Sequence, residues 1–277
     1  MPTPLPPSLR ATVEAQAGAV LLDQVIAAGL TRERVRARVL SGRWFRRYPR
    51  VYVTYDGPTQ RSTQQWAAVL FAGLEAVLSH RSAAELWGLL DALDPDEPID
   101  VTVPSGRRVI QQRGLRVHRS RRILALRHPS RMPPRTRVEE TILDLASGAD
   151  RLADVVCLVT CACQRRRTTP ARLLAALAGR PTLRWRAQLR ALLSDVEEGA
   201  QSPLEVAYLR SVERPHRLPR SVRQTSRRTA AGRQWSDVCY EKYLLLVELD
   251  GRLGHVEEGA FRDRRRDNGA AEDGTGH

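Results

Sequence analysis

The chain has 277 residues, of which 42% are hydrophobic, and it carries 45 basic against 31 acidic residues for a net charge of +14. This length accommodates two or three modest domains with cores of their own. The surplus of positive charge favours a polyanionic partner, most commonly nucleic acid. No uncharged apolar stretch approaches the roughly 20 residues that span a membrane, and residues 1–7 lack the pattern of a signal peptide. We therefore expect a cytoplasmic protein with no membrane partner.

The first 58 residues have the element order of a winged helix-turn-helix module. Apolar periodicity predicts helices over 9–17, 21–28 and 32–40, and Thr31 and Gly42 bracket the third helix with a start and a stop signal. Alternating apolar residues over 51–55 predict a strand. The third helix carries Arg32, Arg34, Arg36 and Arg38, and the segment that leads into the strand carries Arg43, Arg46, Arg47 and Arg50. We predict this module over residues 8–58.

The positions of these arginines suit a DNA contact. Arginines on the third helix can pair with guanine in a major groove, and arginines beside the strand can contact phosphates. The alternative is that the same arginines only solvate two faces of a small domain.

Residues 59–146 read as a mixed α/β region. The pattern predicts two helical pieces over 62–90 that join near Ser79 and His80, strands over 99–103 and 115–118, and a helix over 137–146. We interpret His80 as a capping or packing residue, not as a catalytic one.

Two motifs in this half resemble the AbiEi-type antitoxins. One contains Ser41, Gly42, Trp44, Tyr48, Pro49, Val51 and Tyr52, and the other contains Ser79, His80, Ser82, Ala83 and Leu86. The resemblance covers residues 8–145. It implies a DNA-binding regulator of a type IV toxin-antitoxin or phage-defence system, with a cognate toxin as a possible partner.

The second half begins with an expected helical connector over 147–198, with helices over 152–163, 170–178 and 183–196. We then predict a helix over 202–214, a basic loop, and strands over 235–240 and 243–250. These elements form a domain over 199–268, followed by a small polar tail over 269–277 that we expect to be disordered. The fold class of the whole chain is therefore α+β.

The predicted helix and both predicted strands of this last domain carry acidic residues. Glu205 lies on the predicted helix, Asp237 on the first strand, and Glu248 and Asp250 follow an apolar run on the second. Side chains two residues apart on a strand share a face. Such a set can bind a hard cation through carboxylate oxygens.

This pattern resembles the very short patch repair endonucleases, which belong to the restriction-endonuclease-like PD-(D/E)xK superfamily. The resemblance implies Mg²⁺ as cofactor, held by Asp237, Glu248 and Asp250. It implies a catalytic set of Glu205, Asp237, Glu248, Asp250, His255 and Asp263, and a DNA contact through Arg266.

Two departures from the endonuclease family bear on activity. The lysine of the superfamily motif is absent, and Asp250 occupies its place. The family continues past the Arg266 position with a helix and an apolar strand, so the resemblance implies an endonuclease-like sheet that lacks its last elements. Three hypotheses stay open: a metal-dependent endonuclease, an antitoxin-like regulator without catalysis, and an interaction protein whose charge reflects genome composition.

Overall fold

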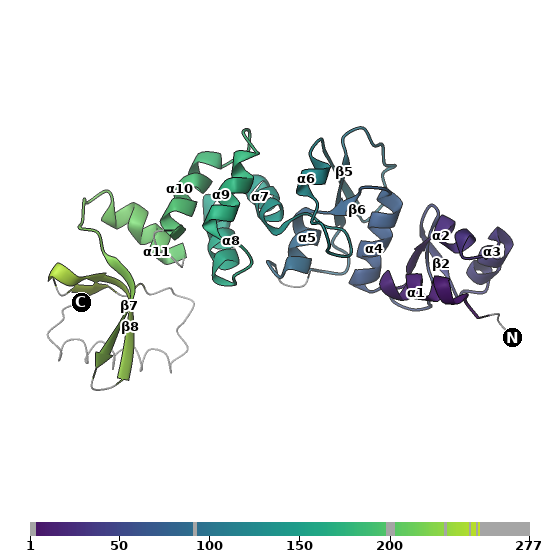
Figure 1. Ribbon diagram of the computed structural model, residues 1–277, viewed down its shortest axis with the longest axis horizontal. Helices are drawn as coiled ribbons and strands as arrows, with labels where there is room; N and C mark the ends of the chain where they lie inside the picture. Colours follow the sequence, from purple (N-terminus) through teal and green to yellow (C-terminus); the bar gives the residue numbers. More distant parts are fainter. Residues whose placement is uncertain are drawn as a thin grey trace. The chain divides into compact units, whose positions relative to one another are not determined.

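The computed structural model describes residues 4–90, 93–197, 203–229, 232–243, 245–247 and 249, and its fold is α+β (Figure 1). These residues form two compact units, divided between Leu145 and Ala146. None of the helices in the described part is long and apolar enough to cross a membrane.

The first unit opens with the order expected of a winged helix. Its elements are α1 (Pro7–Ala15), β1 (Ala19–Leu21), α2 (Leu22–Ala27), α3 (Arg32–Leu40), β2 (Phe45–Tyr48) and β3 (Val51–Val53). The strands form an antiparallel sheet in the order β1-β3-β2. The structure adds β1, which the sequence pattern did not predict, because its three residues merge with the apolar run of α2.

This sheet separates two hydrophobic cores. One core lies under α1, α2 and α3, and it contains Val20, Val35 and Trp44. The other contains Tyr48 and Val51 together with residues of the following helix and sheet. Neighbouring residues of a strand point to opposite faces, so β1 and β3 contribute to both cores.

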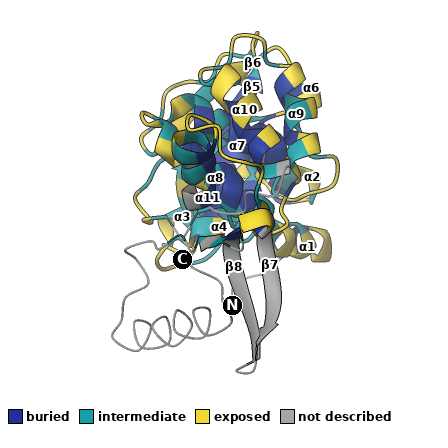
Figure 2. Ribbon diagram, turned by 90° about the vertical axis from the view of Figure 1, so that its left-hand side faces the viewer, coloured by how far each residue is buried: buried dark blue, intermediate teal, exposed yellow. Residues whose placement is uncertain are grey.

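The rest of the first unit is a small mixed layer of helices and strands. Its elements are α4 (Arg61–Ala72), β4 (Val77–Leu78), α5 (His80–Trp87), β5 (Ile99–Pro104), β6 (Leu115–Ser120), α6 (Ile123–Leu126) and most of α7 (Val138–Gly148), whose last residues belong to the second unit. The sheet order is β4-β5-β6, with β4 antiparallel and β6 parallel to β5. The central strand β5 is buried along nearly its whole length (Figure 2).

The second unit consists of helices followed by an antiparallel sheet. Its elements are α8 (Leu152–Gln164), α9 (Pro170–Ala178), α10 (Arg186–Glu197), α11 (Pro203–Tyr208), a π-helical turn (Leu209–Glu213), β7 (Val222–Thr229), β8 (Gly232–Tyr240), a 3-10 turn (Glu241–Tyr243) and β9 (Leu245–Val247). The strand order is β7-β8-β9. The expected basic loop before β8 is only partly correct, because residues 222–229 of that segment pair with β8 as β7.

Candidate nucleic-acid interface

Helix α3 is fixed by a polar cap and by one buried valine. The Thr31 hydroxyl accepts a hydrogen bond from the backbone N–H of Arg34 at 3.3 Å. Val35 is 2% exposed and packs into the core beneath the helix. Hydrogen bonds from the Glu33 backbone N–H and from Thr31 lower the pKa of the Glu33 carboxyl. The helix therefore begins at its expected residue and turns its arginine-bearing side outward.

A concave surface that encloses a volume of about 580 Å³ lies between α3 and the β2–β3 hairpin. Its lining residues are Leu22, Arg32, Val35, Arg36, Val39, Leu40, Arg46 and Tyr52. Arg32 and Arg36 are one helical turn apart, and Arg46 lies opposite Tyr52 in the strand register. All three arginines are exposed, and none has a hydrogen bond or ion pair from its guanidinium group among the described residues.

Two more of the predicted arginines are exposed, and a third is partly covered. Arg34 and Arg43 are exposed, and Arg43 Nε donates to the Ser41 hydroxyl at 2.9 Å. The Arg38 guanidinium lies over the Trp44 ring, 5.5 Å from its centroid. Burial lowers the pKa of Arg38, and the neighbouring charges of Arg43 and Arg34 add to that shift. Arg38 therefore covers the core, and Arg34 and Arg43 extend the exposed basic rim.

The two remaining arginines of the hairpin make contacts within the first unit. Arg50 forms an ion pair with Asp23 of α2, and its backbone is left-handed with φ of +65°. Arg47 is half-buried, with its guanidinium 5.1 Å from the Tyr48 ring centroid. A Cβ atom built on Gly114 would lie 3.4 Å from Arg47 Nη2. In this arrangement Arg47 lies beside the start of β6.

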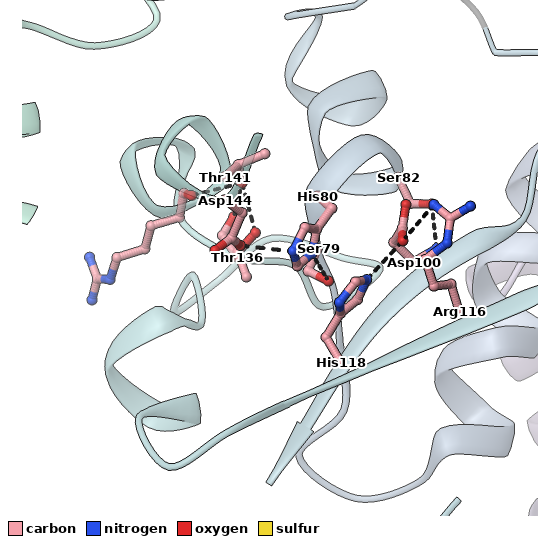
Figure 3. A network of polar contacts seen from close by, with 10 residues as sticks. Ser79, His80, Ser82, Asp100, Arg116, His118, Thr136, Thr141 and Asp144 are labelled. Carbon is pink, nitrogen blue, oxygen red and sulfur yellow. Dashed lines mark hydrogen bonds and ion pairs between the residues drawn. The ribbon is translucent and has the colours of Figure 1, made fainter. Parts of the chain in front are cut away.

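A polar network that the sequence pattern did not predict joins α5, β5, β6 and α7 (Figure 3). Its centre is Asp100, whose side chain is 1% exposed. One carboxylate oxygen of Asp100 accepts from His118 Nε2 at 2.9 Å and from Arg116 Nη1 at 3.3 Å. Its other oxygen is buried and has no hydrogen-bond partner among the described residues.

His80 extends this network toward α7. Figure 3 shows His80 and His118 between Asp144 on one side and Asp100 on the other. His80 Nδ1 lies 3.0 Å from the Ser79 hydroxyl and 4.0 Å from the Asp144 carboxylate. The Ser79 side chain makes no capping hydrogen bond to the helix, and the residue is fully buried. His80 is therefore a packing residue at the start of α5, and its ring packs on His118 of β6 as well as lying near Asp144 of α7.

The endonuclease-like set of acidic residues is only partly described. Glu205 lies on α11 and is 2% exposed, and Asp237 lies on the central strand β8. The other predicted residues, Glu248, Asp250, His255, Asp263 and Arg266, lie outside the described residues. Within the described part, no three His, Cys, Asp or Glu side chains form a group that could hold a metal ion.

Hydrogen bonds connect strand β8 to the helical part of the second unit. The Tyr240 hydroxyl donates to Glu213 Oε2 at 3.3 Å, and the same carboxylate oxygen accepts from the Ser221 hydroxyl at 2.7 Å. The Tyr208 hydroxyl lies 3.2 Å from that of Tyr240. Burial raises the pKa of Tyr240, and the hydrogen bonds and charges of Tyr208 and Glu213 raise it further. A neutral phenol therefore joins β8 to the π-helical turn.

No family model matches the chain, and no curated protein matches it. Among solved structures, the chain is similar to the Rv2827c protein from Mycobacterium tuberculosis, with 16% sequence identity and a TM-score of 0.44. That likeness covers 79% of this chain and 87% of the other.

Proposed function

We propose that this protein binds double-stranded DNA through its winged helix, with α3 and the β2–β3 hairpin as the contact surface. The observation that carries this proposal is the concave surface between them, which Arg32 and Arg36 of α3 line together with Arg46 of the hairpin. Guanidinium groups match the geometry of both guanine edges and phosphates. Three exposed cations on two elements of a winged helix are therefore suited to hold a duplex.

Fluorescence anisotropy with a labelled mixed-sequence duplex, measured over a range of salt concentrations, tests this proposal. The variant Arg32→Ala/Arg36→Ala removes two of the rim cations. The control Arg10→Ala/Arg190→Ala removes the same charge from exposed positions on α1 and α10. We expect the first variant to lose affinity and to reduce the slope of log K against log salt by about 2, because each phosphate contact contributes about 0.9. Equal behaviour of the two variants contradicts the proposal.

A second candidate function is metal-dependent cleavage of DNA by the second unit. The observation that favours it is the order α11, β7, β8 and β9, in which the helix buries Glu205 and the central strand carries Asp237. Mg²⁺ belongs to this candidate, because carboxylate oxygens such as those of Asp237, Glu248 and Asp250 are the ligands it prefers. Nicking of supercoiled plasmid with Mg²⁺ or Mn²⁺ tests it, with Asp237→Ala as the comparison. Metal-dependent nicking that the variant abolishes supports a nuclease.

The absence of cleavage together with retained DNA binding favours the alternative, an antitoxin-like transcriptional regulator. In that case the second unit serves a role other than catalysis, and a cognate toxin becomes the partner to seek. This alternative requires that the protein represses a reporter gene placed behind the DNA upstream of its own gene. The variant Arg32→Ala/Arg36→Ala should lose this repression.

A further inference from the structure

The positive charge of the chain is concentrated in one segment outside the winged helix. Between Asp100 and Glu139 there is no acidic residue. The same segment carries eleven arginines: Arg107, Arg108, Arg113, Arg116, Arg119, Arg121, Arg122, Arg127, Arg131, Arg135 and Arg137. Its formal charge of +11 is therefore most of the net +14 of the whole chain. A local field of this strength attracts polyanions.

Many of these arginines lie on one edge of a sheet. Among the described residues β6 pairs only with β5, so β6 is an edge strand. Six exposed arginines lie on β6 or in the loops at its two ends: Arg108, Arg113, Arg116, Arg119, Arg121 and Arg122. We call these six residues the β6 basic edge.

Most of this charge is not neutralised by the residues that the structure describes. Arg116 pairs with Asp100 and Arg122 with Glu140, at 3.3 and 3.6 Å. The other four side chains, Arg108, Arg113, Arg119 and Arg121, have no hydrogen bond or ion pair in the described part of the chain. An edge strand with such side chains resists pairing with other strands, but that role needs fewer cations than are present here.

The β6 basic edge begins next to the hairpin of the winged helix. Gly114, which precedes β6, lies beside Arg47 Nη2 of β2. The Tyr48 ring of β2 stacks on Phe71 of α4 with centroids 5.0 Å apart, and α4 packs against β5. The hairpin and the edge therefore belong to one compact unit, and a duplex on the hairpin has this second basic surface within reach.

We propose that the β6 basic edge contacts the phosphate backbone of DNA that flanks the winged-helix site. This inference rests on the proposed DNA-binding function and extends it. The six residues of β6 span about 20 Å at roughly 3.3 Å per residue, which corresponds to about six base pairs at roughly 3.4 Å each. Phosphate is favoured over an acidic protein surface because both exposed residues of β6, Arg116 and Arg119, are arginines, while protein interfaces centre on apolar groups.

The test measures the affinity of the full chain for labelled mixed-sequence duplexes of two lengths, about one helical turn and about two turns. The edge variant combines Arg108→Ala, Arg113→Ala, Arg119→Ala and Arg121→Ala. The control variant removes four exposed arginines elsewhere: Arg10→Ala, Arg166→Ala, Arg190→Ala and Arg217→Ala. Thermal unfolding verifies that both variants fold. We expect the edge variant to bind the short duplex like the unaltered chain. The unaltered chain should bind the long duplex more tightly than the short one. The edge variant should lack this gain, and its slope of log K against log salt on the long duplex should be lower by about 3 to 4.

Each other result has a distinct meaning. Equal loss in the edge and control variants overturns the inference, since only total charge then matters. If the edge variant loses affinity for both duplex lengths while Arg32→Ala/Arg36→Ala binds like the unaltered chain, the result supports a DNA contact at the edge and contradicts the winged-helix proposal. Binding to polyglutamate that the edge variant abolishes, without any effect of that variant on DNA, assigns the edge to an acidic protein and contradicts the inference.

Discussion

The imidazole rings of His80 and His118 are stacked, with centroids 3.7 Å apart and planes 17° from parallel. His80 begins α5 with a left-handed φ of +47°, a conformation that is costly for a non-glycine residue. The stack places His118 so that its Nε2 reaches the buried Asp100, and it places His80 beside Ser79 and Asp144. Since β6 is an edge strand, this polar network is one of the contacts that hold it against the helices.

The first prediction concerns the hydrogen bond between His118 and Asp100. His118→Ala leaves a carboxylate that is 1% exposed with one fewer donor, and we expect it to lower the free energy of unfolding by about 2 kcal/mol. Arg116→Ala removes the other donor to the same oxygen, but the Arg116 side chain is 50% exposed, so we expect a loss below about 1 kcal/mol. Urea unfolding of the two variants measures the difference.

A double-mutant cycle separates the hydrogen bond from the volume that the substitution removes. If the pair interacts as the distances indicate, the losses of Asp100→Ala and His118→Ala sum to more than the loss of the double variant, by about 1 kcal/mol. Additive losses would show that the two side chains stabilise the fold independently.

The second prediction concerns pH and His128. Burial lowers the pKa of His128, and the charges of Arg131, Arg137 and Arg135 lower it further, partly opposed by Glu139. The folded state therefore binds this proton less readily than the unfolded state, whose ordinary pKa is 6.5. The associated stability is fully present above that value and is lost as the pH falls below it. His128 Nδ1 also accepts from the backbone N–H groups of Ser130 and Arg131 at 3.3 Å, and protonation there would break both bonds.

We expect the melting temperature of the unaltered chain to fall more steeply below about pH 6.5 than that of His128→Gln, because glutamine does not titrate. Thermal melts at pH steps between about 5 and 7.5 make the comparison. Parallel curves for the two proteins would show that His128 titrates alike in the folded and unfolded states.

Local sequence signals predicted the helices well and the short strands poorly. Helix α3 spans the predicted residues because Thr31 and Gly42 mark its two ends. Strands β1 and β4 have three and two residues, too few to show an alternating pattern. Strand β7 carries the sequence VRQTSRRT, which lacks an apolar alternation, and it forms through pairing with β8.

Residues of the candidate site were predictable where a single helix or strand positions them, and contacts between distant elements were not. Arg32 and Arg36 follow from helical periodicity, but the ion pair of Arg50 with Asp23 is a contact that only the tertiary fold creates. The network around Asp100 joins residues up to 65 positions apart, from Ser79 to Asp144, and no spacing rule connects them. One signal was present, because Asp100 is the one charged residue of a short strand rich in apolar and β-branched residues, where a buried acidic residue needs a partner.

The third prediction concerns Gly73, the residue at which α4 ends. Its φ of +89° and ψ of −160° lie in a region that is nearly restricted to glycine. Gly73→Ala should therefore lower the free energy of unfolding by about 1 to 3 kcal/mol. A Cβ there would also meet the Arg107 guanidinium at 1.9 Å, but that side chain can move aside.

The backbone explanation is tested by removing Arg107 as well. We expect Gly73→Ala to lower the free energy of unfolding by the same amount in the Arg107→Ala background as in the unaltered chain. Gly106→Ala, at a position with open space and no left-handed φ, is the matched control and should be nearly neutral. Full recovery in the double variant would assign the cost to the steric contact with Arg107.

The fourth prediction concerns Asp195, a fully buried carboxylate of α10. It accepts from Arg210 Nε at 2.7 Å and from Arg214 Nη2 at 2.5 Å. The Arg210 side chain is 24% exposed and that of Arg214 is 47% exposed, so water screens the second pair more strongly. Arg210→Met should lower the free energy of unfolding by about 2 to 3 kcal/mol, because it removes a partly buried partner of a buried charge. Arg214→Met should cost less than about 1 kcal/mol.

The variant Asp195→Asn supplies the decisive background for this comparison. With the negative charge removed, the arginine has no buried anion to compensate, so the cost of Arg210→Met should fall by at least about half. Urea unfolding of the single and double variants gives the coupling energy directly. An unchanged cost in the Asp195→Asn background would mean that Arg210 stabilises this helix pair by packing its hydrocarbon stem, and not by its charge.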